Sequence, residues 1–328
     1  MKRILLSLLF VAVAVAIQAQ DAAGVLSLAR RVNDYFVAQN PDPTKPTFVK
    51  KKRTSNLWTR AVYYEGLMDL YSVDPDKRYL EYTDRWGVYH KWTARGSVDD
   101  TNADNQCCEQ TYIDRFAATG DSVMIAPTTE NLNHQMATGR KNYWWWIDAI
   151  QMAMPVYAKY AKISGDRHYL DYAMDCYRDA RDRRGLFNIA DGLWWRDSVY
   201  KAPYKEPDGK NCYWSRGNGW VYAALVRVMK TVDADDPYYK ELLKDYLLMT
   251  HALVKLQRRD GYWNASLVST NYAGPEMTGT ALFLYGMAWG VRNGILNAKE
   301  YRPVCDKAWK ALRGCVHANG FLGYNQGT

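Results

Sequence analysis

The segments that decide the fold are "WIDAIQMAMPVYAKYAKISG" (146–165) and the one that follows it, "DRHYLDYAMDCYRDARDR" (166–183). Apolar and small residues surround most of the first segment, which is typical of a helix buried on all sides. The second segment alternates charged with aromatic and aliphatic residues at helical spacing, as an amphipathic outer helix does. Together they predict a hairpin of one inner and one outer helix.

The same pairing recurs along the chain with a period of roughly 45 to 65 residues, which is typical of an array of helical hairpins. Buried segments begin near residues 55, 104, 217 and 277, and their amphipathic partners begin near residues 75, 122, 236 and 297. Most of these partners open on an Asp or Asn that can cap the first turn. With one more helix at about 24–39, we expect about eleven helices.

Closing such hairpins into a ring gives an all-α fold, the (α/α)6-barrel, with an inner layer of buried helices and an outer amphipathic layer. An open solenoid is the alternative, but Trp-rich loops converge better on one ring mouth. Six hairpins need twelve helices, and the chain ends on the loop-like "GFLGYNQGT" (320–328). We therefore expect residues 20–328 to form a single barrel domain whose final helix is missing from this chain.

The N-terminus, "MKRILLSLLFVAVAVAIQAQ" (1–20), has two basic residues, an apolar stretch and then small residues. This pattern predicts a secretory signal peptide, residues 1–19, cut after Ala19. The apolar stretch is short for a membrane span, and no other segment is a candidate. We expect an exported, periplasmic protein with no membrane partner.

The amino-acid composition indicates which kind of molecule the protein binds. The chain has 26 Tyr and 13 Trp but only 7 Phe, and such amphipathic aromatics are typical of surfaces that bind carbohydrate. The net charge of +8 suits an acidic partner, but no basic run is longer than "KKKR" (50–53), so nucleic acid is not expected. Sequence does not indicate the oligomeric state.

The six cysteines predict neither a metal site nor a disulfide framework. Cys107 and Cys108 are adjacent, and Cys305 and Cys315 lie too far apart on one expected helix to bridge. No CxxC pair or His cluster is present. We expect most cysteines to be small core residues, with no metal and no cofactor.

Two aspartates lie where inner helices begin, which in a ring is one common mouth. Asp148 follows Trp144, Trp145 and Trp146, and Asp104 lies in "VDDTNADNQCC" (98–108). A carboxyl group against apolar aromatics is desolvated, so its pKa rises and it can act as a general acid. A second carboxylate nearby acts in the same direction. The alternative for both residues is capping of a first helical turn.

A third stretch, "NCYWSRGNGW" (211–220), places Arg216 between Trp214 and Trp220 in what we expect to be a glycine-containing loop at the mouth. The Arg216 fork can pair with a sugar carboxylate while an indole stacks on the ring. The alternative is a loop before a helix, with glycines for positive φ, Asn218 as a cap and Trp as a core residue.

With "EMTGTALFLYGMAWGVRNGIL" (276–296), these segments make the chain similar to glycoside hydrolase family 105, the unsaturated rhamnogalacturonyl hydrolases, and to the related family 88. The resemblance implies an (α/α)6-barrel that removes a 4,5-unsaturated uronic acid from the non-reducing end of lyase-generated oligosaccharides. It implies Asp148 as the catalytic acid and Asp104 as the second active-site aspartate. The substrate-binding residues that we expect with them are Met152, Trp58, Lys141, Trp214, Arg216 and Trp220.

The chain departs from this family in "DGLWWRDSVY" (191–200), where many members carry a histidine after "GL". Here Trp194, Trp195 and Arg196 follow instead, at the subsite for the sugar beyond the cleaved bond. Two alternatives remain open: a carbohydrate-binding barrel without catalysis, and another barrel enzyme such as a lyase or an epimerase. An epimerase usually needs histidine acids and bases, and none of the five His lies at an expected inner-helix end.

Overall fold

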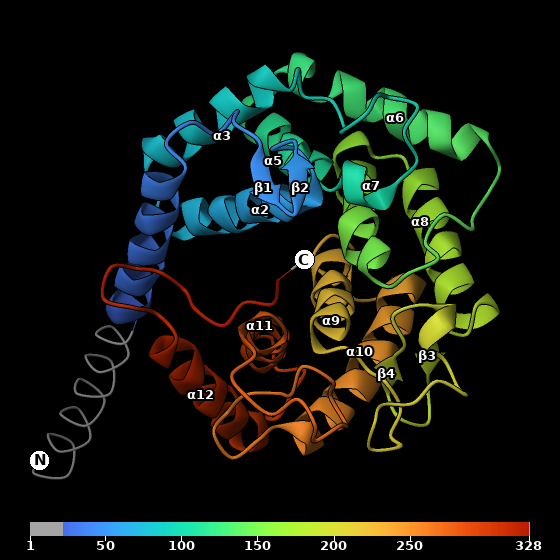
Figure 1. Ribbon diagram of the computed structural model, residues 1–328. Coiled ribbons are helices and arrows are strands. Elements are labelled where there is room, and N and C mark those ends of the chain that lie inside the picture. The colour runs from blue at the N-terminus through green and yellow to red at the C-terminus, as the bar shows by residue number, and fades with distance from the viewer. Residues whose placement is uncertain (1–21, 328) are drawn as a thin grey trace, which may run out of the picture.

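The computed structural model describes residues 22–327, and the proposed signal peptide lies outside them. Helices alternate between the inside and the outside of a ring (Figure 1), so the predicted (α/α)6-barrel fold is confirmed. The inner helices are α2 (Trp58–Val73), α5 (Glu109–Thr119), α7 (Asp148–Ser164), α9 (Ser215–Met229) and α11 (Met277–Arg292). The outer ones are α3 (Lys77–Tyr89), α6 (Ala126–Ala137), α8 (His168–Arg178), α10 (Pro237–Leu256) and α12 (Ala298–Gly314), together with the helix at residues 22–39.

Short elements connect these helices. They are α4 (Ala103–Gln106), the 3-10 turns η1 (Ser122–Met124) and η3 (Ser198–Tyr200), and the π-helical turn η2 (Asp179–Arg183). Strand β1 (Thr47–Val49) pairs antiparallel with β2 (Lys51–Arg53), and β3 (Phe187–Asn188) pairs antiparallel with β4 (Leu193–Trp194). The connection from β4 to η3 lines a cavity of the protein.

The outer helices begin as their sequence predicts. The side chains of Asp76, Asp236 and Asn297 each accept a hydrogen bond from the backbone N–H two residues later, at the starts of α3, α10 and α12. Each of these bonds satisfies one of the N–H groups that a helix N-terminus leaves without an internal partner. These Asp and Asn residues therefore fix where α3, α10 and α12 start.

The inner helices α9 and α11 approach each other closely because both carry glycine at their contact. A Cβ atom on Gly219 would lie 2.9 Å from Leu282 Cδ1 and 3.3 Å from Gly279 Cα. Gly217 and Gly219 lie inside α9, and neither has a positive φ. Helix α9 begins at Ser215, two residues before the predicted start near Gly217, so Arg216 and both glycines lie in the helix and not in the expected loop. The glycines allow this helix to pack closely.

All six cysteines are free, and Cys107, Cys108, Cys176 and Cys315 are buried, so the prediction of thiols that serve mainly as core residues is confirmed. Within residues 22–327, no helix has both the length and the apolar character needed to cross a membrane.

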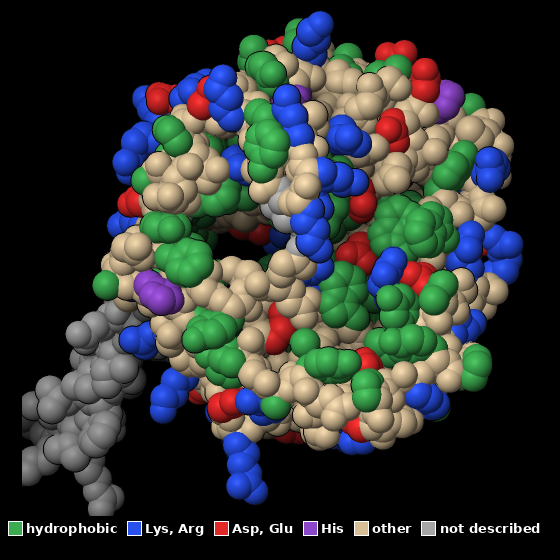
Figure 2. All heavy atoms as spheres, viewed as in Figure 1, with side chains coloured by type: hydrophobic (Ala, Val, Ile, Leu, Met, Phe, Trp, Pro, Cys, Tyr) green, Lys and Arg blue, Asp and Glu red, His purple; other side chains and the backbone are tan. Residues whose placement is uncertain are grey.

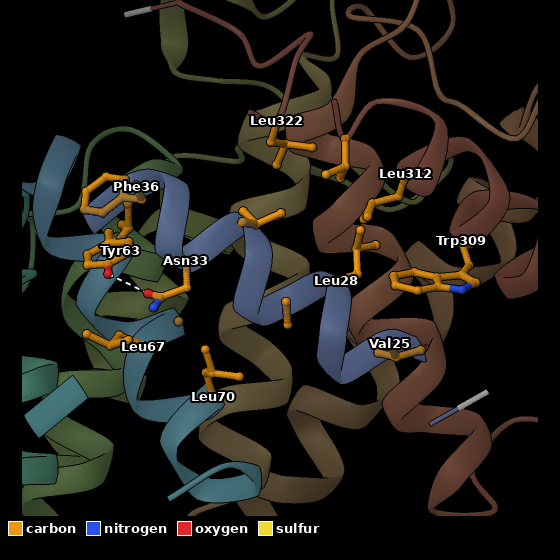
Figure 3. Close-up of a pocket in the computed structure, with 15 residues that line it drawn as sticks. Val25, Leu28, Asn33, Phe36, Tyr63, Leu67, Leu70, Trp309, Leu312 and Leu322 are labelled. Atoms are coloured by element: carbon orange, nitrogen blue, oxygen red, sulfur yellow. Dashed lines mark hydrogen bonds between the residues drawn. The ribbon is translucent and has the colours of Figure 1, made fainter. Parts of the chain in front are cut away.

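An apolar groove of about 440 Å³ runs between the helix at residues 22–39, α2 and α12. Figure 3 shows Leu28, Leu70 and Trp309 among the side chains that line it. The dashed line in Figure 3 marks a hydrogen bond that the Tyr63 hydroxyl donates to Asn33 Oδ1, at 2.7 Å. No carboxylate, cation or histidine is among its lining residues in the described chain, so this groove offers no acid–base chemistry.

Candidate active site

A second cavity, of about 580 Å³, opens at the mouth of the ring, where the inner helices α2, α7 and α9 begin. Figure 2 shows a hollow near the middle of one face of the molecule, with Lys and Arg side chains beside it. Helix starts, one connection after β4 and three loop segments supply its lining: Trp58, Asp148, Arg196, Tyr200, Glu206, Cys212, Trp214, Arg216, Ala265, Ser266, Tyr272, Gln326 and Gly327.

Asp148 is the first residue of α7, and only 8% of it is exposed. Burial raises the pKa of its carboxyl from 3.8 to about 6, against the opposing influence of Arg216 and, more weakly, Arg196. A carboxyl group with this pKa keeps its proton in a substantial fraction of molecules near pH 6, as a general acid must.

Asp104 lies in α4, which packs on α7. Burial and the neighbouring carboxyl of Asp148 raise the pKa of Asp104 to about 7, while Arg53 of β2 opposes the shift. The structure therefore brings the two predicted aspartates together, as sequence reasoning expected. Two carboxyl groups in electrostatic contact resist being ionised together, so the pair retains one proton at a pH where isolated aspartates have lost theirs.

Arg216 supplies the cation of the site. Its guanidinium lies 4.5 Å from the Trp214 ring centroid, and its Nη1 donates to the backbone oxygens of Gln326 (3.0 Å) and Gly327 (3.2 Å). Its Nε is buried and makes no hydrogen bond to any described residue. The guanidinium is thus held in place by one of its nitrogens and keeps donor capacity for an anion.

Two buried polar side chains fix the start of α9, where Arg216 lies. Glu276 accepts a hydrogen bond from the Ser215 hydroxyl (3.0 Å) and also from the backbone N–H of Gly279 (2.9 Å), which ties α9 to α11. Asn218 binds the backbone of Trp194 on both sides: its Oδ1 accepts from the N–H at 2.8 Å, and its Nδ2 donates to the carbonyl at 2.9 Å. Asn218 therefore fastens β4 to the helix instead of capping it.

Among the other predicted binding residues, Trp58 lies in the wall of the cavity together with Trp214 and Arg216. Met152 does not line the cavity. It is fully buried one turn into α7, so it packs in the core instead of at the predicted substrate contact. Trp220 is also buried, at 8% exposure, and is not part of the cavity lining in the described chain.

Lys141 is likewise separated from the site. Its ammonium lies 3.8 Å from the Tyr172 ring centroid and 3.7 Å from the carboxylate of Asp175, and both of these residues belong to the outer helix α8. Lys141 is therefore not among the residues that line the cavity, and its cation contacts the outer layer of the barrel.

Sequence reasoning missed the wall that loops contribute. Glu206 is buried and lines the cavity together with Cys212 and Tyr272, which come from two separate loop segments. No periodicity marks such residues, because loop side chains meet only after the helices have packed. Only Arg196 could have been found from the sequence, because the segment after "GL" departs from the family pattern.

The described residues include no group of three or more His, Cys, Asp or Glu placed to hold a metal ion. The charged side chains that line the cavity are Asp148, Glu206, Arg196 and Arg216, and Asp104 lies within electrostatic reach of Asp148.

Comparison with known proteins supports the fold and identifies the family. A relative from Formosa agariphila named "Unsaturated 3S-rhamnoglycuronyl hydrolase" is 30% identical over 295 residues, which cover 82% of this chain and 76% of the relative. A solved structure named glycosyl hydrolase family 88, from Bacteroides vulgatus, is 33% identical with a TM-score of 0.85, and covers 93% of this chain and 89% of that one. Another, named a polysaccharide lyase, is 31% identical with a TM-score of 0.86, and covers 93% of this chain and 88% of that one. The profile of Glycosyl Hydrolase Family 88 matches residues 28–328, and the chain belongs to that family.

Proposed function

We propose that this glycoside hydrolase removes a 4,5-unsaturated uronic acid from the non-reducing end of lyase-generated oligosaccharides of the rhamnogalacturonan type, the activity of family 105. The observation that carries the proposal is the buried, proton-retaining Asp148 in the same cavity as Arg216. An unsaturated uronate needs both groups, a cation for its carboxylate and an acid for its double bond. The name of the Formosa agariphila relative supports the same substrate class.

The residues support a reaction by hydration of the double bond. Arg216, stacked on Trp214, binds the sugar carboxylate through its unused donors. Asp148 gives its proton to C4, which leaves oxocarbenium character at C5 and the ring oxygen. Water then attacks C5 and loses a proton to the ionised Asp148, which restores the acid. The resulting hemiketal opens, and the bond to the next sugar breaks as the aglycone leaves.

Asp104 has two possible roles within this scheme. Its carboxyl raises the pKa of Asp148 through like-charge proximity, or it holds the attacking water. The first role predicts a shifted pH profile in its absence, and the second predicts lower activity at every pH. We favour the first because the carboxyl of Asp148 acts on the pKa of Asp104, so the two groups lie within electrostatic reach of each other.

A polysaccharide lyase is the second candidate, since a structure with that name is 31% identical to this chain. The two activities change the same chromophore in opposite directions. A hydrolase of this kind destroys the C4=C5 bond and lowers the near-ultraviolet absorbance of an unsaturated disaccharide. A lyase creates such bonds and raises the absorbance of an intact uronate polymer.

The test is to mix the protein separately with unsaturated disaccharides and with intact rhamnogalacturonan, and to follow absorbance in both. We expect a fall with the disaccharides and no rise with the polymer. A rise with the polymer would replace the proposal by a lyase. Binding of the disaccharide at constant absorbance would indicate a barrel that binds carbohydrate without catalysis.

We also propose that the protein is exported to the periplasm after cleavage at Ala19, as its N-terminal sequence predicts. Intact-mass measurement on protein recovered from the periplasm tests this. A mature chain that retains residues 1–19 would contradict it.

A further inference from the structure

Arg196 lies in the cavity wall on a segment that is fastened at two points. Trp194, two residues earlier, is bound on both sides of its backbone by Asn218 of α9. The backbone oxygen of Arg196 itself accepts a hydrogen bond from the N–H of Ile147, at 2.9 Å. Since Ile147 immediately precedes Asp148, the position of Arg196 is set relative to the proposed acid.

The side chain of Arg196 is oriented as well. Its Nε lies 3.0 Å from Asp197 Oδ2, and the other oxygen of this buried carboxylate accepts the N–H of Val199 at 2.8 Å. The guanidinium also lies 5.3 Å from the Tyr200 ring centroid. No other ion pair or hydrogen bond of this guanidinium is made with residues 22–327, so donors remain for an anion.

The two cations of the cavity differ in depth. Arg216 is 8% exposed, whereas the Arg196 side chain is 42% exposed. Both arginines lower the pKa of Asp148, and Arg216 does so more strongly. With the uronate carboxylate on Arg216 and its double bond at Asp148, the rest of the substrate must extend toward the open side of the cavity. Arg196 lines the cavity and is the more exposed of its two arginines, so we place it on that open side.

We propose that Arg196, steadied by Asp197 and Tyr200, recognises an anionic substituent on the sugar that follows the cleaved bond. A sulfate ester and a carboxylate share the required chemistry, since the planar fork of arginine donates to either. The inference rests on the proposed function and adds a determinant of substrate choice. Because Asp197 already neutralises part of the charge and the head group is exposed, the expected preference is about tenfold.

The test compares three unsaturated disaccharides that share the same uronate and carry as second sugar a neutral rhamnose, a sulfated rhamnose or a uronic acid. We expect the unaltered protein to show a kcat/KM about tenfold higher for the anionic substrates, mainly through KM. Arg196→Gln should abolish this ratio, and Arg196→Lys should retain part of it. A gain confined to one anion identifies sulfate or carboxylate as the ligand.

Arg167→Gln is the matched control, because Arg167 also pairs with a carboxylate (Asp236) and lies 4.8 Å from a tyrosine ring centroid (Tyr238), but on the outer layer. It should leave the ratio unchanged. An unaltered protein without preference, or a preference that survives in Arg196→Gln, would overturn the inference while leaving the proposed function intact. Failure to hydrolyse any of the three disaccharides would refute the proposed function itself, and the inference with it.

Discussion

Replacing Asp104 by Asn removes a carboxyl group while keeping the shape of the side chain. In the structure, the pKa of Asp104 is raised to about 7 by burial and by the carboxyl of Asp148. Electrostatic interaction is mutual, so Asp104 in turn hinders ionisation of Asp148. Loss of the Asp104 charge must therefore lower the pKa of Asp148 and leave less of the acid protonated at a given pH.

The magnitude follows from the interaction of two nearby carboxylates, which amounts to about one pKa unit or about 1.4 kcal/mol. At pH 8, where Asp104 is ionised, its charge raises the pKa of Asp148 by this one unit and keeps roughly a tenth of Asp148 protonated. In Asp104→Asn the pKa of Asp148 stays at about 6, so roughly a hundredth is protonated at the same pH. Activity of Asp104→Asn should thus be about tenfold lower at pH 8 and change little near pH 4.5, where the acid is protonated in both proteins.

The assay is the rate of absorbance loss with an unsaturated disaccharide between pH 4 and 8, at saturating and at low substrate. Asp99→Asn is the matched control, since Asp99 is an exposed carboxylate that pairs with His134 and lies five residues earlier. It should leave the profile unchanged. A uniform fall of Asp104→Asn activity at all pH values would refute electrostatic tuning and assign Asp104 to water binding.

Three further changes give distinct outcomes. Arg216→Lys should lose about 1.5–3 kcal/mol of transition-state stabilisation in kcat/KM, because an ammonium cannot form the fork; an unchanged value would make Arg216 a packing residue. The pKa of Asp148 is about 6 in the folded protein, compared with the ordinary aspartate value of 3.8 that applies to the unfolded chain. Ionisation of Asp148 therefore destabilises the fold as pH rises through 6. Asp148→Asn should therefore raise unfolding free energy by up to about 3 kcal/mol at pH 7.5 and by little at pH 4; equal gains would contradict the linkage. Gly279→Ala should lower thermal stability because its Cβ would collide with Ser215, whereas Gly66→Ala, with no atom within 4 Å, should raise it slightly; melting curves of equal midpoint would refute the close contact of α9 and α11.

Sequence was sufficient for the parts of this molecule that periodicity controls. The alternation of buried and amphipathic helices predicted the ring, and tryptophans ahead of Asp148 predicted a desolvated acid at a helix start. Both follow from local patterns whose physical effect does not depend on distant residues.

Other features depend on how distant segments meet, and sequence could not supply them. Gly219 looked like a loop residue, although its role is set by Leu282 on another helix. Lys141 precedes α7 in sequence, yet its cation contacts residues of α8. Glu206 and Tyr272 meet only because two loops of the barrel come together at the mouth.

The central claim is that Asp148 is the acid of a glycosidase that hydrates an unsaturated uronate. The most direct test compares the unaltered protein with Asp148→Asn, measuring substrate binding by calorimetry and turnover by absorbance loss on the same disaccharide. The amide keeps the size and hydrogen bonding of the side chain but has no acidic proton. We expect retained binding with kcat lowered roughly 10²- to 10⁴-fold or more. Near-normal turnover by Asp148→Asn would contradict it and place the acid elsewhere around the mouth.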